Sequence, residues 1–99
     1  MENENKKVIK LDLTGCKYLG EIHERIREAF DFPEWYGQNW DAFWDLLRTE
    51  CDVDKLKIYG EYTLPESLKK SIESMHQILE DHKRKREDYD EAFDIQIIN

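Results

Sequence analysis

Two aspartates, Asp41 and Asp45, lie four residues apart in the sequence, among the three tryptophans of the chain, Trp35, Trp40 and Trp44. Carboxylates at this spacing fall on one face of a helix, where they repel each other by roughly 0.2–0.5 kcal/mol. A cationic partner would reverse that cost, and aromatic side chains nearby supply the contact area typical of binding hot spots. From the residues alone two interpretations stay open, namely recognition of a positively charged partner and a solvated acidic face of the kind common on soluble proteins.

The spacing requires a helix from about residue 40 to residue 50. Apolar side chains recur at helical intervals and are expected to form the inward face of this helix, namely Trp40, Phe43, Trp44 and Leu47. An adjacent polar face carries Gln38, Asp41, Asp45 and Arg48. Asn39, or alternatively Gln38, is the expected N-cap, and Gly37 is expected to give the preceding loop its backbone freedom.

Catalytic and metal-binding arrangements are not recognisable in the sequence. His76 and His82 are six residues apart, whereas two ligands on one helical face need a spacing of four. A pairing of His76 with Glu80 is of a kind common on protein surfaces, and Asp41 and Asp45 have no evident cleft in which to act as acid and base. We therefore predict no enzymatic activity, no metal and no cofactor.

The charge balance excludes two classes of partner. The net charge is −8, from 23 acidic and 15 basic residues, which disfavours binding to nucleic acid or to anionic membranes. The basic run 83–86 is followed at once by acids, so we interpret it as an internally paired end of a helix. Cys16 and Cys51 fit no metal or redox spacing and are expected to be buried, reduced thiols. Residues 1–10 contain no apolar signal segment, and we expect a cytoplasmic protein.

Alternating patterns along the chain predict a single α/β domain over residues 1–99. Strands are expected at residues 8–13, 56–59 and 93–98, with helices at 18–30, 40–50 and 64 to about 82. Residues 83–91 are either an exposed extension of the last helix or a loop, and residues 1–6 are expected to be frayed. Strands that alternate with helices indicate a small three-stranded parallel sheet with the helices packed on it.

The stretch 32–47 resembles the signature of the barstar family, intracellular inhibitors of small secreted ribonucleases. The matching residues are Pro33, Glu34, Trp35, Tyr36, Gly37, Asn39, Asp41, Ala42, Phe43, Trp44 and Asp45. The expected order of elements agrees with the family over nearly the whole chain. The resemblance implies a barstar-like fold and an inhibitor, monomeric when free, that blocks the RNA site of a basic, extracellular-type ribonuclease.

Roles for individual residues follow from the resemblance. Asp45 would take the place of an RNA phosphate with Asp41 beside it, and Trp35 would be an aromatic platform on the loop. The rest of the contact surface would comprise Asn39, Trp40 and Trp44, with a further acid late in the last helix, near Glu80 or Asp81. Phe43 is more readily explained as core, Trp40 fits either role, and Asn39 could serve only as a cap.

Arg48 departs from the better-known members of the family, which place small residues and an aromatic after the position of Asp45. Arg48 is one helical turn from Asp45 and could pair with it, which would damp the charge offered to a partner. It would also repel a basic enzyme unless that enzyme offers an acidic spot. The alternative function is therefore an acidic interaction module of the same fold whose basic partner is another nuclease or a toxin.

Overall fold

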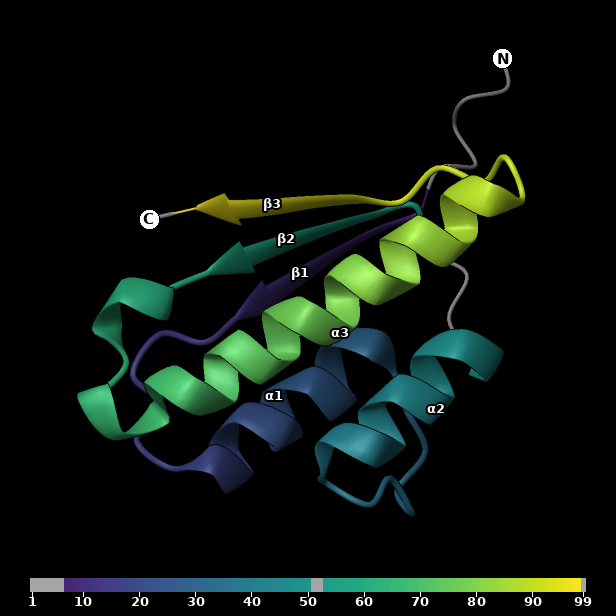
Figure 1. The fold of residues 1–99 in the computed structure, drawn as a ribbon. Coiled ribbons are helices and arrows are strands. Elements are labelled where there is room, and N and C mark those ends of the chain that lie inside the picture. The colour runs from purple at the N-terminus through teal and green to yellow at the C-terminus, as the bar shows by residue number, and fades with distance from the viewer. Residues whose placement is uncertain (1–6, 51–52, 99) are drawn as a thin grey trace.

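The computed structural model describes residues 7–50 and 53–98, so the segment 1–6 that was expected to be frayed and the thiol of Cys51 lie outside the described residues. The elements, in chain order, are β1 (Val8–Asp12), α1 (Leu19–Phe30), α2 (Trp40–Glu50), β2 (Lys55–Tyr59), the short 3-10 helices η2 (Glu61–Thr63) and η3 (Glu66–Leu68), α3 (Lys69–Asp88) and β3 (Asp94–Ile98). The predicted α/β fold is confirmed (Figure 1).

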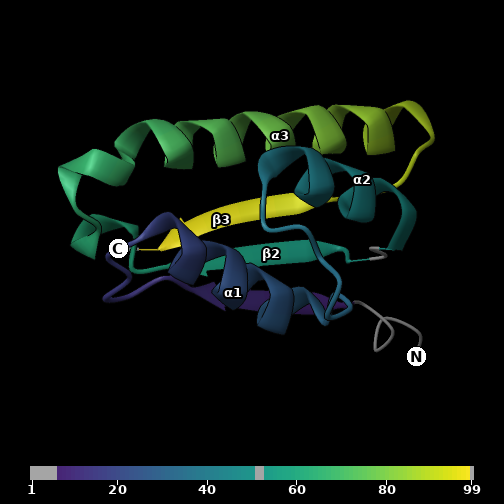
Figure 2. The same ribbon diagram turned by 90° about the horizontal axis from the view of Figure 1, so that it is seen from below.

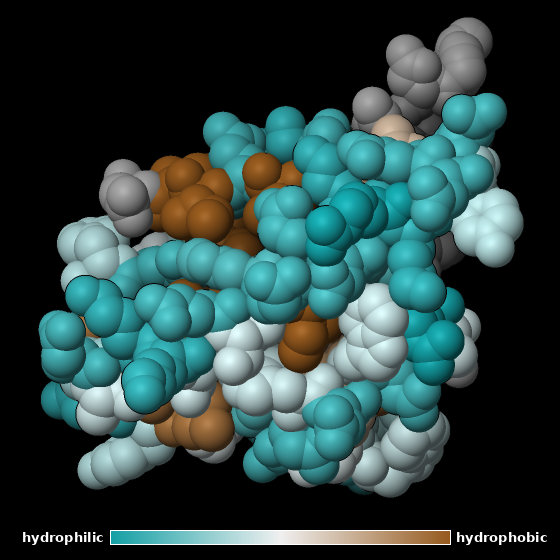
Figure 3. All heavy atoms as spheres, viewed as in Figure 1, coloured by the Kyte–Doolittle hydropathy of each residue, from teal (hydrophilic) through white to brown (hydrophobic). Residues whose placement is uncertain are grey.

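The three strands form one parallel sheet in the order β1-β2-β3, with β2 at its centre. Residues alternate across each strand, so that Ile9, Leu56 and Ile95 align in one row and point to the helices. This alternation explains why apolar residues occur at every second position of β1 and β2. Ile97, on the edge strand β3, remains 44% exposed, and hydrophobic side chains reach the surface beside this strand (Figure 3).

The helices cover the same face of the sheet, and the core lies between the two layers (Figures 1 and 2). Helix α1 packs on β1, whereas α2 packs against α3. Each helix supplies a stripe of buried apolar side chains, comprising Ile22, Ile26 and Phe30 from α1, Phe43, Leu46 and Leu47 from α2, and Ile72, Met75 and Leu79 from α3. This packing fixes α2, which carries the predicted site, at one end of the layer of helices.

The last helix differs from its predicted bounds at both ends. Pro65 precedes η3 as its N-cap, so α3 begins at Lys69 rather than at residue 64. The charged block is helical as far as Asp88, so of the two alternatives left open for residues 83–91 the structure shows the extension of the last helix. Arg86 explains the extension, because its guanidinium donates to the carbonyl oxygens of Val53 and Ala92, each at 2.9 Å, and so ties the helix end to the sheet.

Cys16 is a free, buried thiol, and burial raises its pKa. This agrees with the expectation of a reduced cysteine for the one thiol that the structure describes. In the described ranges, none of the helices combines the length and the apolar character needed to cross a membrane.

Candidate functional site

Buried side chains anchor the loop that joins α1 to α2 to the hydrophobic core. Helix α1 ends at Phe30, and Asp31 turns the chain with a left-handed backbone (φ 58°). Phe32 and Tyr36 then return to the core and are only 3% and 5% exposed. The Tyr36 hydroxyl lies 2.7 Å from Nδ1 of His23, a fully buried residue of α1. Burial raises the pKa of Tyr36 and lowers the pKa of His23, so both groups are neutral near pH 7.

Aromatic rings fill the space between this anchor and α2. The Trp40 ring packs on His23 with a centroid separation of 4.4 Å and meets the edge of Phe43 at 5.8 Å. Phe32 contacts both Tyr36 and Phe43. The loop therefore has a buried inner side of packed rings, of which the sequence analysis assigned only Trp40 and Phe43 to an inward-facing stripe.

The start of α2 is fixed by polar contacts in the loop. Asn39 is confirmed as the N-cap, because its Oδ1 accepts the backbone N–H of Ala42 at 2.8 Å. The left-handed residue is Gln38 (φ 54°), so the prediction that Gly37 provides this freedom was wrong. At Gly37 a Cβ would lie 3.3 Å from Asn39 Nδ2, a tight contact that requires the Asn39 side chain to shift by a few tenths of an ångström. The Gln38 side chain donates to Glu24 of α1 at 3.0 Å, which steadies the turn.

The solvent-facing side of the α1–α2 loop and of α2 is polar and exposed. The Trp35 side chain on the loop is 73% exposed, and Asp41 on α2 is also exposed. Asp45 has a 70% exposed side chain and accepts one hydrogen bond from Arg48 at 3.1 Å, so the two are paired in the free protein. The Arg48 guanidinium also lies over the half-buried Trp44 ring, 5.5 Å from its centroid.

The predicted aromatic stripe of α2 divides into two parts. Phe43 is fully buried, as expected for a core residue, and Leu46 joins it in the core. Trp40 and Trp44 are only partly buried, so part of each side chain remains accessible to solvent. This arrangement leaves a surface in which acids and aromatic rings alternate, with both fixed to a rigid core.

The late acids predicted from the family lie on α3. Glu80 is exposed, and Asp81 accepts hydrogen bonds from Arg84 and Gln77 along its own helix. Successive residues of a helix are turned by about 100°, so Glu80 and the buried His82 point in nearly opposite directions. Neither Glu80 nor Asp81 lines the hollow between His82 of α3 and Arg48 of α2, and their part in binding a partner stays a prediction.

A hollow of about 370 Å³ separates the end of α2 from the end of α3. Arg48 lines it from α2, and His82, 4% exposed, lines it from α3. Its acids are Asp88 and Glu91, which sequence reasoning did not select because they stand in a block that is charged on all sides. The hollow therefore adjoins Asp45 through its partner Arg48.

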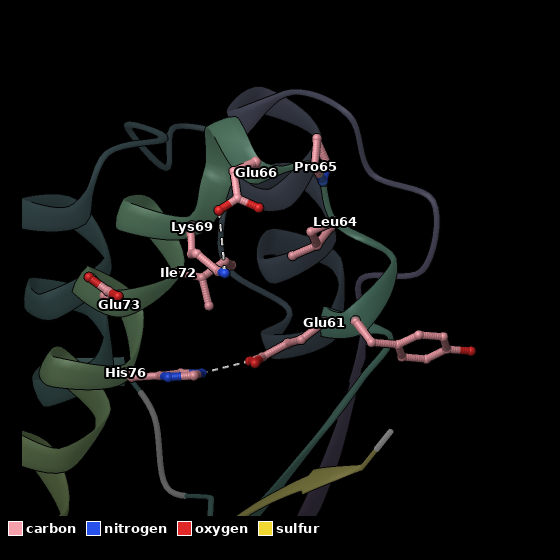
Figure 4. Close-up of a pocket in the computed structure, with 9 residues that line it drawn as sticks. Glu61, Leu64, Pro65, Glu66, Lys69, Ile72, Glu73 and His76 are labelled. Atoms are coloured by element: carbon pink, nitrogen blue, oxygen red, sulfur yellow. Dashed lines mark hydrogen bonds and ion pairs between the residues drawn. The ribbon is translucent and has the colours of Figure 1, made fainter.

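A second hollow, of about 410 Å³, lies at the other end of α3 (Figure 4). Glu61 of η2 and His76 of α3 point toward each other across it, with 2.7 Å between Oε2 and Nε2. The Glu61 carboxylate accepts this hydrogen bond from His76 and raises the pKa of His76. This pair joins the 3-10 segment to the helix, and we interpret it as a structural contact because no predicted site residue lines the hollow.

Within residues 7–50 and 53–98, the structure contains no group of three or more His, Cys, Asp or Glu side chains arranged to hold a metal ion. The site is thus composed of exposed acids, aromatic rings and one arginine, a set suited to contact with another protein.

Comparison with known proteins gives two matches. Residues 6–98 match the family described as Barstar (barnase inhibitor). The chain is also similar to a Bacillus subtilis (strain 168) protein named "Putative ribonuclease inhibitor YrdF", with 33% identity over 48 residues. That alignment covers 48% of this chain, and the chain spans about half (52%) of the length of this relative. From the match over residues 6–98, the chain belongs to the barstar family.

Proposed function

We propose that this protein is a cytoplasmic inhibitor of a basic ribonuclease and that it covers the RNA site of the enzyme with its α1–α2 loop and α2. The observation that carries the proposal is the exposure of Asp45 and Trp35, whose side chains are 70% and 73% exposed on a unit with a rigid inner side. The inhibitor class of the family and the name of the Bacillus relative support the same conclusion.

Asp45 is the proposed mimic of an RNA phosphate. A carboxylate can accept two parallel hydrogen bonds from one guanidinium, and such charge-assisted pairs are the stronger hydrogen bonds in proteins. Asp41 adds a second negative charge one turn earlier, while Trp35, Trp40 and Trp44 supply apolar contact area. A net charge of −8 would accelerate encounter with a basic enzyme.

A further acidic contact can come from one of two places. The family resemblance favours Glu80 or Asp81, and the hollow beside Arg48 favours Asp88 or Glu91. We favour Glu80 or Asp81, because Glu91 is engaged by Arg86 at 3.1 Å and Asp88 lies in a hollow lined by three cations. Alanine variants of the four acids, tested one at a time for inhibition, distinguish these possibilities by which one weakens it.

The central experiment measures binding by calorimetry, together with inhibition of RNA cleavage, for barnase and a panel of other secreted microbial ribonucleases. Asp45→Ala is compared with Glu66→Ala. Glu66 also belongs to an exposed ion pair with spacing i,i+3, to Lys69 at 3.5 Å, so it is a matched control. We expect Asp45→Ala to weaken the tightest complex by 100-fold or more, whereas Glu66→Ala should leave it unchanged.

Two results would contradict this proposal. If Asp45→Ala and Glu66→Ala weaken binding equally, net charge rather than the site is responsible. If no enzyme of the panel is bound, the ribonuclease assignment fails and the alternative partner, another basic nuclease or a toxin, becomes the better candidate.

A further inference from the structure

Positive charge gathers at one place on the binding side of this acidic protein. Three cationic side chains, Arg48, Lys85 and Arg86, line the hollow of about 370 Å³ between the ends of α2 and α3. His82 lines it as well, is 4% exposed, and its Nε2 has no hydrogen-bond partner among the described residues. The hollow thus combines cations with a buried polar atom that is not yet satisfied.

The three cations are not equally available to a ligand. Arg86 is committed to structure through two backbone carbonyls, and its Nε lies 3.1 Å from Glu91. Arg48 donates one hydrogen bond to Asp45, its side chain is 44% exposed, and the Trp44 ring supports its guanidinium. A guanidinium has five N–H donors, so this single bond leaves most of them open.

Lys85 and Asp88 complete the balance of charge in the hollow. Both side chains are exposed, and neither has an ion pair within the part of the chain that the structure describes. Glu91 is matched by Arg86, and in the free protein Arg48 is matched by Asp45, so Lys85 and Asp88 balance each other. Once a cation of the partner binds Asp45, Arg48 is released and the hollow carries one excess positive charge. The hollow is therefore suited to a single anionic group.

We propose that this hollow receives a carboxylate side chain of the partner protein, and that Arg48 is the residue that selects for it. The inference rests on the proposed function and adds a requirement to it, namely that the basic partner carries an Asp or Glu beside the cations that bind Asp45. A polyanion such as RNA does not fit the same description, because Asp45, paired with Arg48 at the edge of the hollow, and Asp88 in its lining would repel it.

The selection arises from an exchange of partners. In the free protein Arg48 is paired with Asp45, and an exposed pair of this kind is easily broken. When a cation of the enzyme forms an ion pair with Asp45, Arg48 loses its own partner. Arg48 then faces the basic surface of the enzyme, which repels it. A carboxylate at the rim of that surface removes the repulsion and pairs with the released guanidinium. An enzyme that lacks such an acid is rejected, so Arg48 is a repulsive element as well as an attractive one.

The test uses inhibition constants of the full chain, Arg48→Ala and Arg48→Lys against barnase and the same ribonuclease panel. For the enzyme that the unmodified chain inhibits most strongly, we expect Arg48→Ala to weaken inhibition by about 10-fold or more, which corresponds to about 1.4 kcal/mol. Arg48→Lys should restore only part of this, because an ammonium keeps the charge without the planar pair of donors.

Lys69→Ala is the matched control, since it removes one positive charge from the exposed pair with Glu66. Lys69 stands 16 residues before Lys85 on α3, or about 24 Å along the helix. Inhibition by this variant should equal that of the unmodified chain. Thermal unfolding of each variant confirms that the fold is retained, and it should be, because Arg48 is exposed on the outer face of α2.

Alanine substitution of exposed acids around the RNA cleft of the inhibited enzyme, combined with Arg48→Ala in double-mutant cycles, locates the carboxylate. Coupling of fivefold or more with one acid supports the inference. Unchanged or tighter inhibition by Arg48→Ala, across every enzyme that the unmodified chain inhibits, overturns it and leaves the proposed function in place. If the unmodified chain inhibits none of the enzymes, the proposed function fails and this inference fails with it.

Discussion

Burial of His82 predicts a defined loss of stability as the pH falls below 7. The residue is 4% exposed and packs edge-on against Phe93 with a centroid separation of 4.9 Å. Burial, with a smaller contribution from the charge of Arg86, lowers its pKa from 6.5 to about 4. We therefore expect the neutral imidazole to persist in the folded protein where the unfolded chain is already protonated.

The sign of the effect follows from which state binds the proton first. Because the pKa in the folded state lies below that in the unfolded chain, the stabilisation is fully present above pH 6.5 and is lost as the pH falls toward about 4. Between pH 7 and pH 5 roughly 1.5 pKa units of this window are crossed, and each unit corresponds to about 1.4 kcal/mol. The expected loss of unfolding free energy from His82 is thus about 2 kcal/mol.

The assay is urea denaturation at pH 7, 6 and 5, followed by tryptophan fluorescence, for the unmodified chain and His82→Gln. Other groups also titrate, since burial lowers the pKa of His23 and the Glu61 contact raises that of His76. The difference between the two pH profiles isolates His82, because glutamine does not ionise. Parallel profiles would refute the reasoning, because they would mean that the imidazole is protonated as easily in the fold as in the unfolded chain.

Three shorter predictions test other features. Gly60→Ala should lower the free energy of unfolding, measured by urea denaturation, by at least about 2 kcal/mol, because Gly60 has φ +83° and a Cβ would lie 2.2 Å from Thr14 Oγ1. The control Gly20→Ala should not lower it, because the space around Gly20 is open. Glu61→Gln should lower the pKa of His76 measured by NMR titration. In the unmodified protein the His76–Glu61 pair stabilises the fold below pH 6.5, and this stabilisation is lost as the pH rises; the variant should lack this pH-dependent contribution. Association with a basic ribonuclease, measured by stopped flow, should slow steeply with added salt; a constant rate would contradict electrostatic steering.

Local patterns were sufficient to predict the elements that carry apolar periodicity. The strands, α1 and α2 lie within a residue or two of their predicted bounds, and Asn39 was identified as a cap from its type and place. The end of α3 could not be predicted in the same way, since a block charged on all sides gives no periodic signal. Its helicity depends on Arg86, whose acceptors at Val53 and Ala92 are set by the tertiary fold.

The site shows the same division between local and tertiary information. Exposure of Asp45 and burial of Phe43 follow from helical spacing, and both are found. The left-handed turn at Gln38 was missed because glycine is the usual residue in that conformation, whereas here its side chain is held by Glu24. The hollow at Arg48 was missed because it forms between two helices that are distant in sequence.

The two faces of α2 have different roles: the buried face stabilises the fold, and we expect the exposed face to bind the partner. Phe43 and Leu47 are fully buried, so a change at either alters packing and costs stability. Asp45 and Arg48 are exposed and touch mainly each other, so they can change with little effect on the fold. A family that keeps the inward face and varies the outward one can therefore present the same unit to different enzymes. By this reasoning we expect the exposed pair Asp45–Arg48, rather than the buried face of α2, to decide which enzyme is bound, and this expectation rests on the proposed function.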